Sequence, residues 1–477
     1  MIKRKIKILF TAAEAEPFVK IGGLGDYAGS LPLKLQQHLP QIDIRLAIPF
    51  HGCIATDISK LSQIKTIKFD FGGKQKKAEI FQTRLDGLCV YLIRPIPPYD
   101  DPAVYYTNSE KNGQKYAFFS LACLEMLKAI KWQPDVIHAN DWHTSYLVLK
   151  LNRLRANEDI YKPIKTLLTI HNLGYMGGDN SKLLVKLGLE TGIPIKELPA
   201  WAIHQPLPLG LASADQISTV SPTYSKEILT HEFGYGLEKI LQKRSKSLTG
   251  ILNGINQTKW DPATDNKIAA QFSVEKLEIR CENKFYLQEF LNLEKDINTP
   301  LLGVISRMDI QKGIDLIISA IPLLTHHSWQ LVILGSGSHD IEQACMQLEK
   351  KYPQRVRVVL RFDEMLACQI YAGADMLLIP SRYEPCGTTQ MIAMRYGCIP
   401  IARATGGLRD TIIHEVNGYL FKDSSANSLA QILAKAIHCN HSKPKEWRDM
   451  QYSAMKSDFS WEQSAQKYAD LYFQMIS

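Results

Sequence analysis

Short apolar runs alternate along the chain with amphipathic stretches whose apolar residues recur every three or four positions. The short runs predict buried strands and the amphipathic stretches predict helices. Strands separated by helices are typical of a parallel sheet with helices on both faces. In the first half we expect strands at residues 6–12, 43–49, 90–94, 136–139, 165–170 and 216–220, and helices at residues 29–39 and 116–130.

The same alternation starts again in the second half and predicts a second sheet. Its expected strands are residues 301–306, 330–335, 356–360, 376–380 and 399–402, and its expected helices are residues 313–323, 341–350 and 389–396. Aromatic and apolar residues at helical spacing in the last segment predict a helix that packs an aromatic face on the body of the protein. We therefore expect an α/β chain with domains at residues 1–249 and 250–457 and a final helix at residues 458–477.

Composition narrows the class of protein. A chain of 477 residues is too long for one core, and its 45% hydrophobic and 22% charged residues are ordinary for a globular protein. Its nine cysteines include no Cys-x-x-Cys pair, which favours a reducing cytoplasm over a disulfide framework or a zinc site. We expect a cytoplasmic protein, or a plastid one only if a transit peptide has been removed, with no membrane or nucleic-acid partner. The net charge of +8 indicates a solvated surface, with an anionic substrate as the alternative.

A glycine turn, KIGGLGD at residues 20–26, follows the first expected strand. Its spacing is not G-x-G-x-x-G, and no acidic residue ends the strand at 43–49, so a dehydrogenase is disfavoured. A tight turn explains the glycines, but it does not explain the charges of Lys20 and Asp26 on either side. A second glycine-rich block spans residues 384–390 and continues at 405–408. One such turn in each half predicts a phosphate-bearing ligand held between two domains.

Charged residues also follow strands of the second expected sheet. Arg307 and Lys312 lie on a strand-to-helix loop, where two cations can neutralise a diphosphate without metal. The chain has no Asp-x-Asp pair of the kind that holds a metal ion beside a nucleotide sugar. Glu384 follows the strand at 376–380 and could accept hydrogen bonds from sugar hydroxyls, while residues 387–389 open the next helix with N–H groups available to phosphate. The alternatives without a ligand are that Arg307 and Lys312 are ordinary solvated cations and that Glu384 is a favourable negative charge at a helix N-terminus.

Polar residues end two strands of the first half as well. His171 follows the strand at 165–170, and Asp141 follows the strand at 136–139. A single histidine is more often structural, but loops that converge on one edge of a sheet favour a site there. His138 and His143 could suggest a metal, yet nothing completes a set of ligands, so we expect none.

Taken together, these segments resemble the bacterial glycogen synthases and plant starch synthases, which are retaining glucosyltransferases that use ADP-glucose. The resemblance covers nearly the whole chain, and so many matches in one order are highly specific. The matching segments are residues 20–26, 134–138 (PDVIH), 141–143 (DWH), 169–173 (TIHNL), 220–224 (VSPTY), 250–254 (GILNG), 306–313 (SRMDIQKG), 371–375 (YAGAD), 380–387 (PSRYEPCG) and 458–461 (DFSW).

The resemblance implies the GT-B fold, in which two doubly wound domains face each other across a cleft and the final helix crosses back to the N-terminal domain. It also implies a role for each matching residue, with no metal and no cofactor. Four residues would be catalytic: His171 at the anomeric centre, Arg307 and Lys312 on the diphosphate, and Glu384 on the glucose hydroxyls. The donor would further contact Lys20, Gly22, Gly23, Asn253, Phe362 (stacked on the base), Cys386, Gly387, Thr388 and Thr389, and the acceptor would face Asp26 and Asp141.

The implied reaction moves glucose from ADP-glucose to the non-reducing end of an α-1,4-glucan such as glycogen or a maltooligosaccharide. The chain departs from the family pattern at residues 177–186 and 201–210 and at Asn256, Thr388 and Ile392. Two alternatives therefore stay open. One is a GT-B transferase with a different nucleotide sugar or a small acceptor, and the other is a weakly active, glucan-binding relative.

Overall fold

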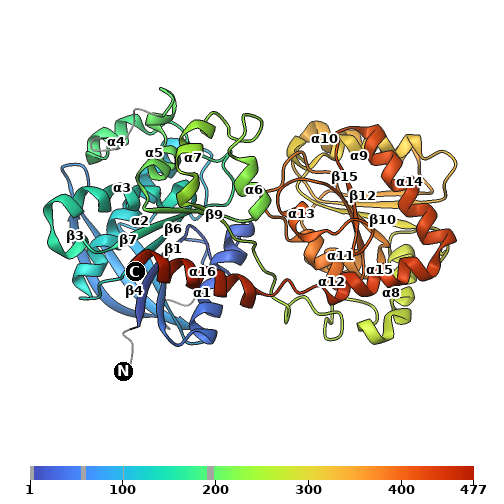
Figure 1. Ribbon diagram of the computed structural model, residues 1–477, viewed down its shortest axis with the longest axis horizontal. Coiled ribbons are helices and arrows are strands. Elements are labelled where there is room, and N and C mark those ends of the chain that lie inside the picture. Colours follow the sequence, from blue (N-terminus) through green and yellow to red (C-terminus); the bar gives the residue numbers. More distant parts are fainter. Residues whose placement is uncertain (1–4, 55–60, 100, 191–197) are drawn as a thin grey trace. The chain divides into compact units, whose positions relative to one another are not determined.

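The computed structural model describes residues 5–54, 61–99, 101–190 and 198–477. The chain folds into two compact units, shown in Figure 1. The N-terminal domain comprises Met1–Gly254 together with Trp461–Ser477, and the C-terminal domain comprises Ile255–Ser460. The division after Gly254 falls a few residues later than the seam expected from the sequence.

Across the described residues, the N-terminal domain is built on a nine-stranded sheet in the order β3-β4-β5-β2-β1-β6-β7-β8-β9. The strands from β5 to β9 in this order run parallel, and all six strands predicted for this half are present. The strands are β1 (Ile6–Thr11), β2 (Ile42–Pro49), β3 (Ser62–Asp70), β4 (Gln75–Leu85), β5 (Leu88–Ile96), β6 (Val136–Asn140), β7 (Lys165–Ile170), β8 (Gln216–Thr219) and β9 (Leu248–Gly250).

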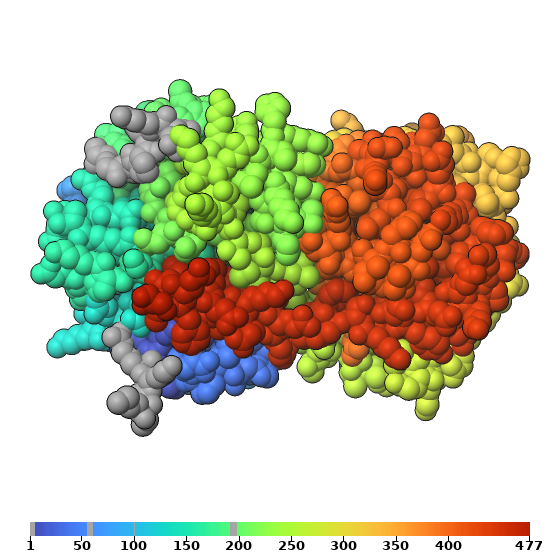
Figure 2. Space-filling model, viewed as in Figure 1, coloured from blue at the N-terminus to red at the C-terminus, as the bar shows by residue number. Residues whose placement is uncertain are grey.

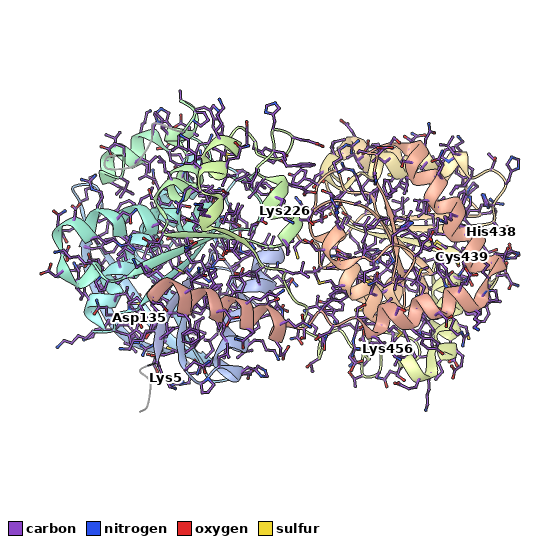
Figure 3. All side chains as sticks on the ribbon, viewed as in Figure 1. Lys5, Asp135, Lys226, His438, Cys439 and Lys456 are labelled. Atoms are coloured by element: carbon purple, nitrogen blue, oxygen red, sulfur yellow. The ribbon has the colours of Figure 1, made fainter. Side chains whose placement is uncertain are left out.

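Helices cover this sheet, and side chains fill the layers between them and the strands (Figure 3). The first helix begins at Gly23, six residues before the expected start at residue 29, because Gly22 is extended and already serves as the N-cap. The second is capped by Asn108, whose side chain accepts the Lys111 N–H at 2.9 Å. The helices are α1 (Gly23–His38), α2 (Ser109–Ala129), α3 (Asp141–Asn157), α4 (Ser181–Leu187), α5 (Pro206–Ser213), α6 (Pro222–Glu227) and α7 (Glu238–Lys243).

The antiparallel hairpin β3–β4 at the edge of this sheet was not predicted. Its outer positions carry lysines, and Lys68 lies directly opposite Lys77. The inner positions Ile67 and Phe69 are buried, with the Phe69 ring 5.1 Å from that of Phe118 in α2. Lysines on an edge strand discourage pairing with a second molecule. Their alternation with buried apolar residues is also a strand signal, so the sequence does carry a pattern for β3.

The C-terminal domain has a six-stranded sheet over its described residues, in the order β12-β11-β10-β13-β14-β15 and parallel throughout. The five predicted strands are present, and only the three-residue β15 was missed. The strands are β10 (Leu301–Ile305), β11 (Gln330–Leu334), β12 (Val356–Val359), β13 (Met376–Ile379), β14 (Ile399–Arg403) and β15 (Tyr419–Phe421). The helices are α8 (Arg280–Phe290), α9 (Ile314–Ala320), α10 (His339–Lys351), α11 (Glu364–Gly373), α12 (Thr389–Arg395), α13 (Gly406–Thr411), α14 (Ala426–Ser442) and α15 (Pro444–Lys456).

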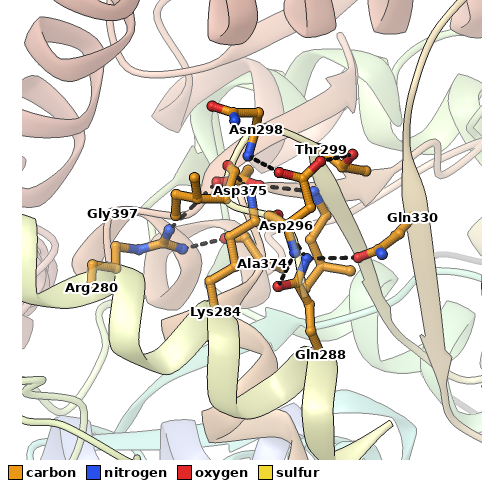
Figure 4. A network of polar contacts seen from close by, with 12 residues as sticks. Arg280, Lys284, Gln288, Asp296, Asn298, Thr299, Gln330, Ala374, Asp375 and Gly397 are labelled. Carbon is orange, nitrogen blue, oxygen red and sulfur yellow. Dashed lines mark hydrogen bonds and ion pairs between the residues drawn. The ribbon is translucent and has the colours of Figure 1, made fainter. Parts of the chain in front are cut away.

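A buried polar network fastens α8 to this second sheet (Figure 4). The carboxylate of Asp375 accepts the Leu301 N–H at 2.8 Å and lies 2.8 Å from Lys284 Nζ. Arg280, also buried, donates to the carbonyl oxygens of Tyr371 and Tyr396. Both cations and the carboxylate are almost fully removed from water, so the charges depend on each other for stabilisation.

The final helix, α16 (Trp461–Ile476), belongs to the N-terminal domain, where it packs against α1 (Figures 1 and 2). Its buried face carries the aromatic residues predicted for it. The Tyr472 hydroxyl lies 2.7 Å from Nδ1 of the buried His138, and Lys34 of α1 forms a 2.7 Å ion pair with Glu462. Within the described ranges, no helix is both long and apolar enough to cross a membrane.

Candidate functional site

The glycine turn of the N-terminal domain is organised by a buried carboxylate. Glu14, just after β1, is only 2% exposed, and its Oε2 accepts the N–H groups of Ile21 and, at 3.2 Å, of Gly22. Its Oε1 accepts the Tyr105 hydroxyl at 3.1 Å, and burial raises the pKa of the carboxyl. The Gly22 amide, expected to contact a donor diphosphate or sugar, is therefore directed at Glu14 in this structure.

The glycines at 22 and 23 are not required by local packing. Gly22 has an extended backbone, and a Cβ added there would lie 3.7 Å from the nearest atom, a normal contact. A Cβ added at Gly23 would meet nothing within 4 Å. The protein itself therefore leaves room for a side chain at both positions.

The charges that flank this turn are paired with each other. Lys20 Nζ lies 2.6 Å from Asp26 Oδ1 and 3.8 Å from Glu16, and both Lys20 and Asp26 are about one-third exposed. Asp26 lies in the first turn of α1, where burial raises the pKa of its carboxyl. The structure thus brings the expected donor-side lysine and acceptor-side aspartate into one ion pair at the carboxyl end of β1.

His171 and Asp141 also meet, at the carboxyl ends of β6 and β7. Asp141 Oδ1 accepts the His171 N–H at 2.7 Å, and the His171 ring nitrogen Nε2 lies 2.9 Å from Asn140 Oδ1. The Asn140 amide nitrogen donates to the Thr11 carbonyl at 3.0 Å, which fixes its oxygen as the acceptor. Burial lowers the pKa of His171 to about 3. The imidazole is therefore neutral, with its proton on Nε2 and Nδ1 left as an acceptor.

The surroundings of Asp141 disfavour its ionised carboxylate. The residue starts α3 with a left-handed backbone (φ +55°) and is 8% exposed. Burial raises the pKa of its carboxyl from 3.8 to about 7, against the opposing effect of backbone N–H groups from His171 and Asn172, and the charge of Glu14 adds to the rise.

Replacing Asp141 with asparagine is expected to stabilise the N-terminal domain at pH 8. Between pH 4 and 7 the folded protein keeps a proton on Asp141 that the unfolded chain releases, so stability from this group falls as pH rises through 7. Asparagine removes this penalty, accepts the same His171 N–H and tolerates a positive φ. We expect a gain of about 2–4 kcal/mol at pH 8 that shrinks toward pH 5, measured by urea unfolding at both values. A variant less stable than the parent at pH 8, or one with an equal gain at both pH values, would contradict this account.

In the C-terminal domain the central feature is the pair formed by Lys312 and Glu384. Lys312 Nζ lies 2.6 Å from Glu384 Oε2, which also accepts the Ser381 hydroxyl at 3.0 Å. Lys312 follows β10 in a short turn capped by Asp309, whose side chain accepts the Lys312 N–H at 2.9 Å. Glu384 follows β13, the strand next to β10. The two expected catalytic residues therefore meet because their strands are neighbours in a parallel sheet.

The second glycine pair packs against the backbone of the Glu384 loop. A Cβ added at Gly406 would lie 1.8 Å from the Glu384 carbonyl oxygen, and one at Gly407 would lie 2.1 Å from that of Cys386. The Gly407 N–H donates to the Glu384 carbonyl at 3.1 Å. These glycines let one loop pass directly against the next, which gives them a packing role that the sequence did not indicate. Their predicted contact with a phosphate-bearing ligand stays a prediction.

The other expected residues of this domain lie around the pair. The Gln390 side-chain amide donates to the carbonyls of Cys386 and Gly387, at 3.2 and 2.8 Å, and α12 begins at Thr389 with Thr388 as its N-cap. Arg307 is more than half exposed and lies 3.4 Å from Asp309. Phe362, the expected platform for a base, is 88% exposed.

Asn253, near the end of the N-terminal domain, has a buried side-chain oxygen with no hydrogen-bond partner among the described residues. Buried acceptors in proteins are nearly always satisfied, so such an atom is suited to a ligand hydroxyl. Groups of three or more histidine, cysteine or acidic side chains placed to hold a metal ion are absent from the described part of the chain.

Sequence reasoning missed Glu14 and Tyr105. Glu14 carries a signal that could have been used, because an acidic residue directly after a parallel strand lies at the edge where sites form. Tyr105 lies between β5 and α2, and no local pattern relates it to Glu14, which is 91 residues away.

Comparison with known proteins shows which family the chain belongs to. Residues 7–243 match the family model described as the starch synthase catalytic domain, and residues 288–454 match that of glycosyl transferases group 1. The chain is 37% identical over 479 residues to the glycogen synthase of Thermotoga maritima, covering 98% of each chain. It is 37% identical over 485 residues to the glycogen synthase of Lactobacillus acidophilus, covering 99% of this chain and all of that one. The chain belongs to the glycogen and starch synthase family.

Solved structures agree with this membership. The catalytic domain of starch synthase IV from Arabidopsis thaliana, determined with ADP and acarbose, superposes with a TM-score of 0.88 at 31% identity and covers 99% of both chains. Sucrose-phosphate synthase from Thermosynechococcus elongatus matches with a TM-score of 0.64 at 18% identity, which reflects a shared fold. The predicted GT-B architecture is confirmed, and the chain is a glycogen or starch synthase-like glucosyltransferase, and so a hexosyltransferase.

Proposed function

We propose that this member of the family transfers glucose from ADP-glucose to the non-reducing end of an α-1,4-glucan, with retention of anomeric configuration. The observation that carries the proposal is the Lys312–Glu384 pair at neighbouring strand ends, 2.6 Å apart. It occurs in a chain that matches a plant starch synthase solved with ADP and acarbose over 99% of its length.

The chemistry of the donor explains why cations are needed beside this pair. Cleavage of the bond between C1 and phosphate builds negative charge on the departing ADP, and groups fixed in advance near that charge lower the barrier. Arg307 and Lys312 follow the same strand, β10, and are proposed to bind the diphosphate. They would supply the positive charge that a metal ion supplies in other enzymes, so the proposal includes no metal and no cofactor.

Glu384 is proposed to exchange one partner for another during binding. It now accepts from Lys312 and Ser381. When Lys312 turns to phosphate, an oxygen of the Glu384 carboxylate becomes available to accept a hydrogen bond from a glucose hydroxyl. A hydrogen bond to an ionised carboxylate is stronger than one between neutral groups. The amides near Cys386, Gly387, Thr388 and Thr389, the Asn253 side chain and the Phe362 ring are the further proposed donor contacts.

The N-terminal domain is proposed to serve the sugar and the acceptor. His171 is neutral and hydrogen-bonded through Nε2, so it offers an uncharged acceptor where positive charge develops on the sugar ring. Lys20 and the backbone at Gly23 are proposed to approach the donor, and Asp26 and Asp141 the acceptor. Attack on the same face as the departing phosphate, with that phosphate taking the acceptor's proton, would retain configuration without a protein nucleophile.

A transfer assay tests the proposal. Radiolabelled ADP-glucose and UDP-glucose are each incubated with the protein, with and without a maltooligosaccharide primer. We expect label in the longer oligosaccharide from ADP-glucose only when primer is present, and much less from UDP-glucose. Equal or faster transfer from UDP-glucose would reject the proposed base, and release of nucleotide without extension of the primer would reject the glucan acceptor.

A further inference from the structure

The Lys312–Glu384 contact depends on two loops that are far apart in sequence. The residues are separated by 72 positions, and each follows its own strand. Strand pairing between β10 and β13 fixes the loop bases at Leu302–Met376 and Gly303–Leu377. The residues beyond the strand ends need a separate device to keep an amine and a carboxylate 2.6 Å apart.

Arg382, in the Glu384 loop, makes contacts that hold this loop against the Lys312 loop. Its guanidinium forms a two-pronged pair with Asp315 at the start of α9, with Nη1 2.8 Å from Oδ1 and Nη2 2.6 Å from Oδ2. Nη1 also donates to the Ile310 carbonyl at 2.6 Å, and the Arg382 backbone N–H donates to the Gln311 carbonyl at 2.7 Å. One residue of the Glu384 loop thus holds the residues on both sides of Lys312.

Further contacts join the Lys312 loop to the Glu384 loop. Gln311 donates to the Tyr383 carbonyl at 3.3 Å, and Arg403 of β14 donates to the Arg382 carbonyl. Gly313 has φ +70°, and a Cβ there would lie 2.2 Å from the Pro380 carbonyl oxygen. The two loops therefore touch closely and are joined on both sides of that contact. A planar guanidinium with a bidentate partner restricts orientation as well as distance.

We propose that Arg382, through Asp315 and the backbone of residues 310–311, is a positioning residue that holds the Lys312 loop and the Glu384 loop at the spacing from which Lys312 reaches the diphosphate and Glu384 the sugar. This inference rests on the proposed function of that pair. In this proposal Arg382 acts through the loop of Lys312, since its two terminal nitrogens bond Asp315 and the Ile310 carbonyl.

Kinetics of Arg382→Ala in two backgrounds test the proposal. In the parent we expect kcat with ADP-glucose to fall at least tenfold, with a smaller change in KM. In a Lys312→Ala background the same substitution is expected to cost less than twofold, because the residue it positions is already gone. Arg382→Lys should recover part of kcat, since one ammonium cannot bond both Asp315 oxygens and Ile310. A full tenfold loss in both backgrounds would overturn the proposal.

The matched control is Arg395→Ala. Arg395 lies 3.3 Å from Asp261 in the same domain and is exposed to a similar degree, but it touches neither loop. We expect it to leave kcat unchanged within a factor of two. A loss equal to that of Arg382→Ala would show that a missing surface ion pair is sufficient, which would contradict positioning.

Hydrogen–deuterium exchange provides a readout that does not depend on activity. Peptides covering residues 306–313 and 380–389 should exchange faster in Arg382→Ala than in the parent, and at parental rates in Arg395→Ala. If the parent transfers no glucose, the proposed function fails, while exchange still decides whether Arg382 holds the loops. Unchanged exchange, or faster exchange with unchanged kcat in an active enzyme, rejects the positioning role.

Discussion

Replacing Lys312 with alanine is expected to lower kcat for glucosyl transfer by about 10²–10³-fold while the fold is retained. The size follows by analogy with the loss of a single group that stabilises charge on a departing oxyanion, which costs about 3–4 kcal/mol of barrier. Lys312 is only one-fifth exposed, and its partner Glu384 is less than one-tenth exposed. Steady-state rates with ADP-glucose and a maltooligosaccharide, with circular dichroism as the check on folding, measure the effect.

Lys295→Ala is the control for this variant. Lys295 also forms a 2.6 Å ion pair with a glutamate of the same domain, Glu289, but both side chains are half exposed or more. Exposed pairs contribute about 0–1 kcal/mol, so rates and stability should stay near those of the parent. A Lys312→Ala enzyme with more than a tenth of parental kcat would remove Lys312 from the chemistry, whatever the control does.

Replacing Asp375 with alanine is expected to destabilise the C-terminal domain by about 3–5 kcal/mol, because it leaves Lys284 buried without its counter-charge. The loss also removes the acceptor for the Leu301 N–H at the start of β10. The destabilisation of each domain is measured from the urea concentration at which a buried cysteine thiol of that domain becomes open to alkylation. The Cys398 thiol is fully buried in the C-terminal domain, and the Cys123 thiol is fully buried in the N-terminal one.

Alkylation of Cys398 should begin at much lower urea in Asp375→Ala, while the Cys123 transition stays in place. Asp449→Ala, at an exposed position of α15 in the same domain, is expected to change the free energy of unfolding by less than about 0.5 kcal/mol. A Cys398 transition that moves by less than about 1 kcal/mol in Asp375→Ala would mean that the buried charges tolerate separation, against the usual behaviour of such groups.

The strands of both sheets, and the site residues that directly follow them, could be predicted because they depend on the pattern of apolar residues within short segments. Parallel strands buried on both faces appear as continuous apolar runs, and the residues directly after them lie at one edge by geometry alone. That is why Lys312 and Glu384, and likewise Asp141 and His171, could be grouped from sequence. The β3–β4 hairpin was open to the same reasoning, because buried Ile67 and Phe69 of β3 alternate with exposed Lys68 and Asp70.

What could not be predicted depends on contacts between distant segments. Glycines look alike in sequence whether they admit a ligand or a neighbouring backbone, so the packing of Gly406 and Gly407 on the Glu384 loop is not visible in the sequence. The position of Glu14 after β1 places it at this edge of the sheet, but the sequence does not indicate that the Gly22 amide donates to it.

A crystal structure with ADP and a maltooligosaccharide tests the central claim most directly. The account predicts that Arg307 and Lys312 both lie within hydrogen-bond distance of the diphosphate, that Lys312 has turned from Glu384 to phosphate, and that Glu384 faces a sugar hydroxyl. A diphosphate bound elsewhere, with Lys312 still 2.6 Å from Glu384 as it is now, would contradict it.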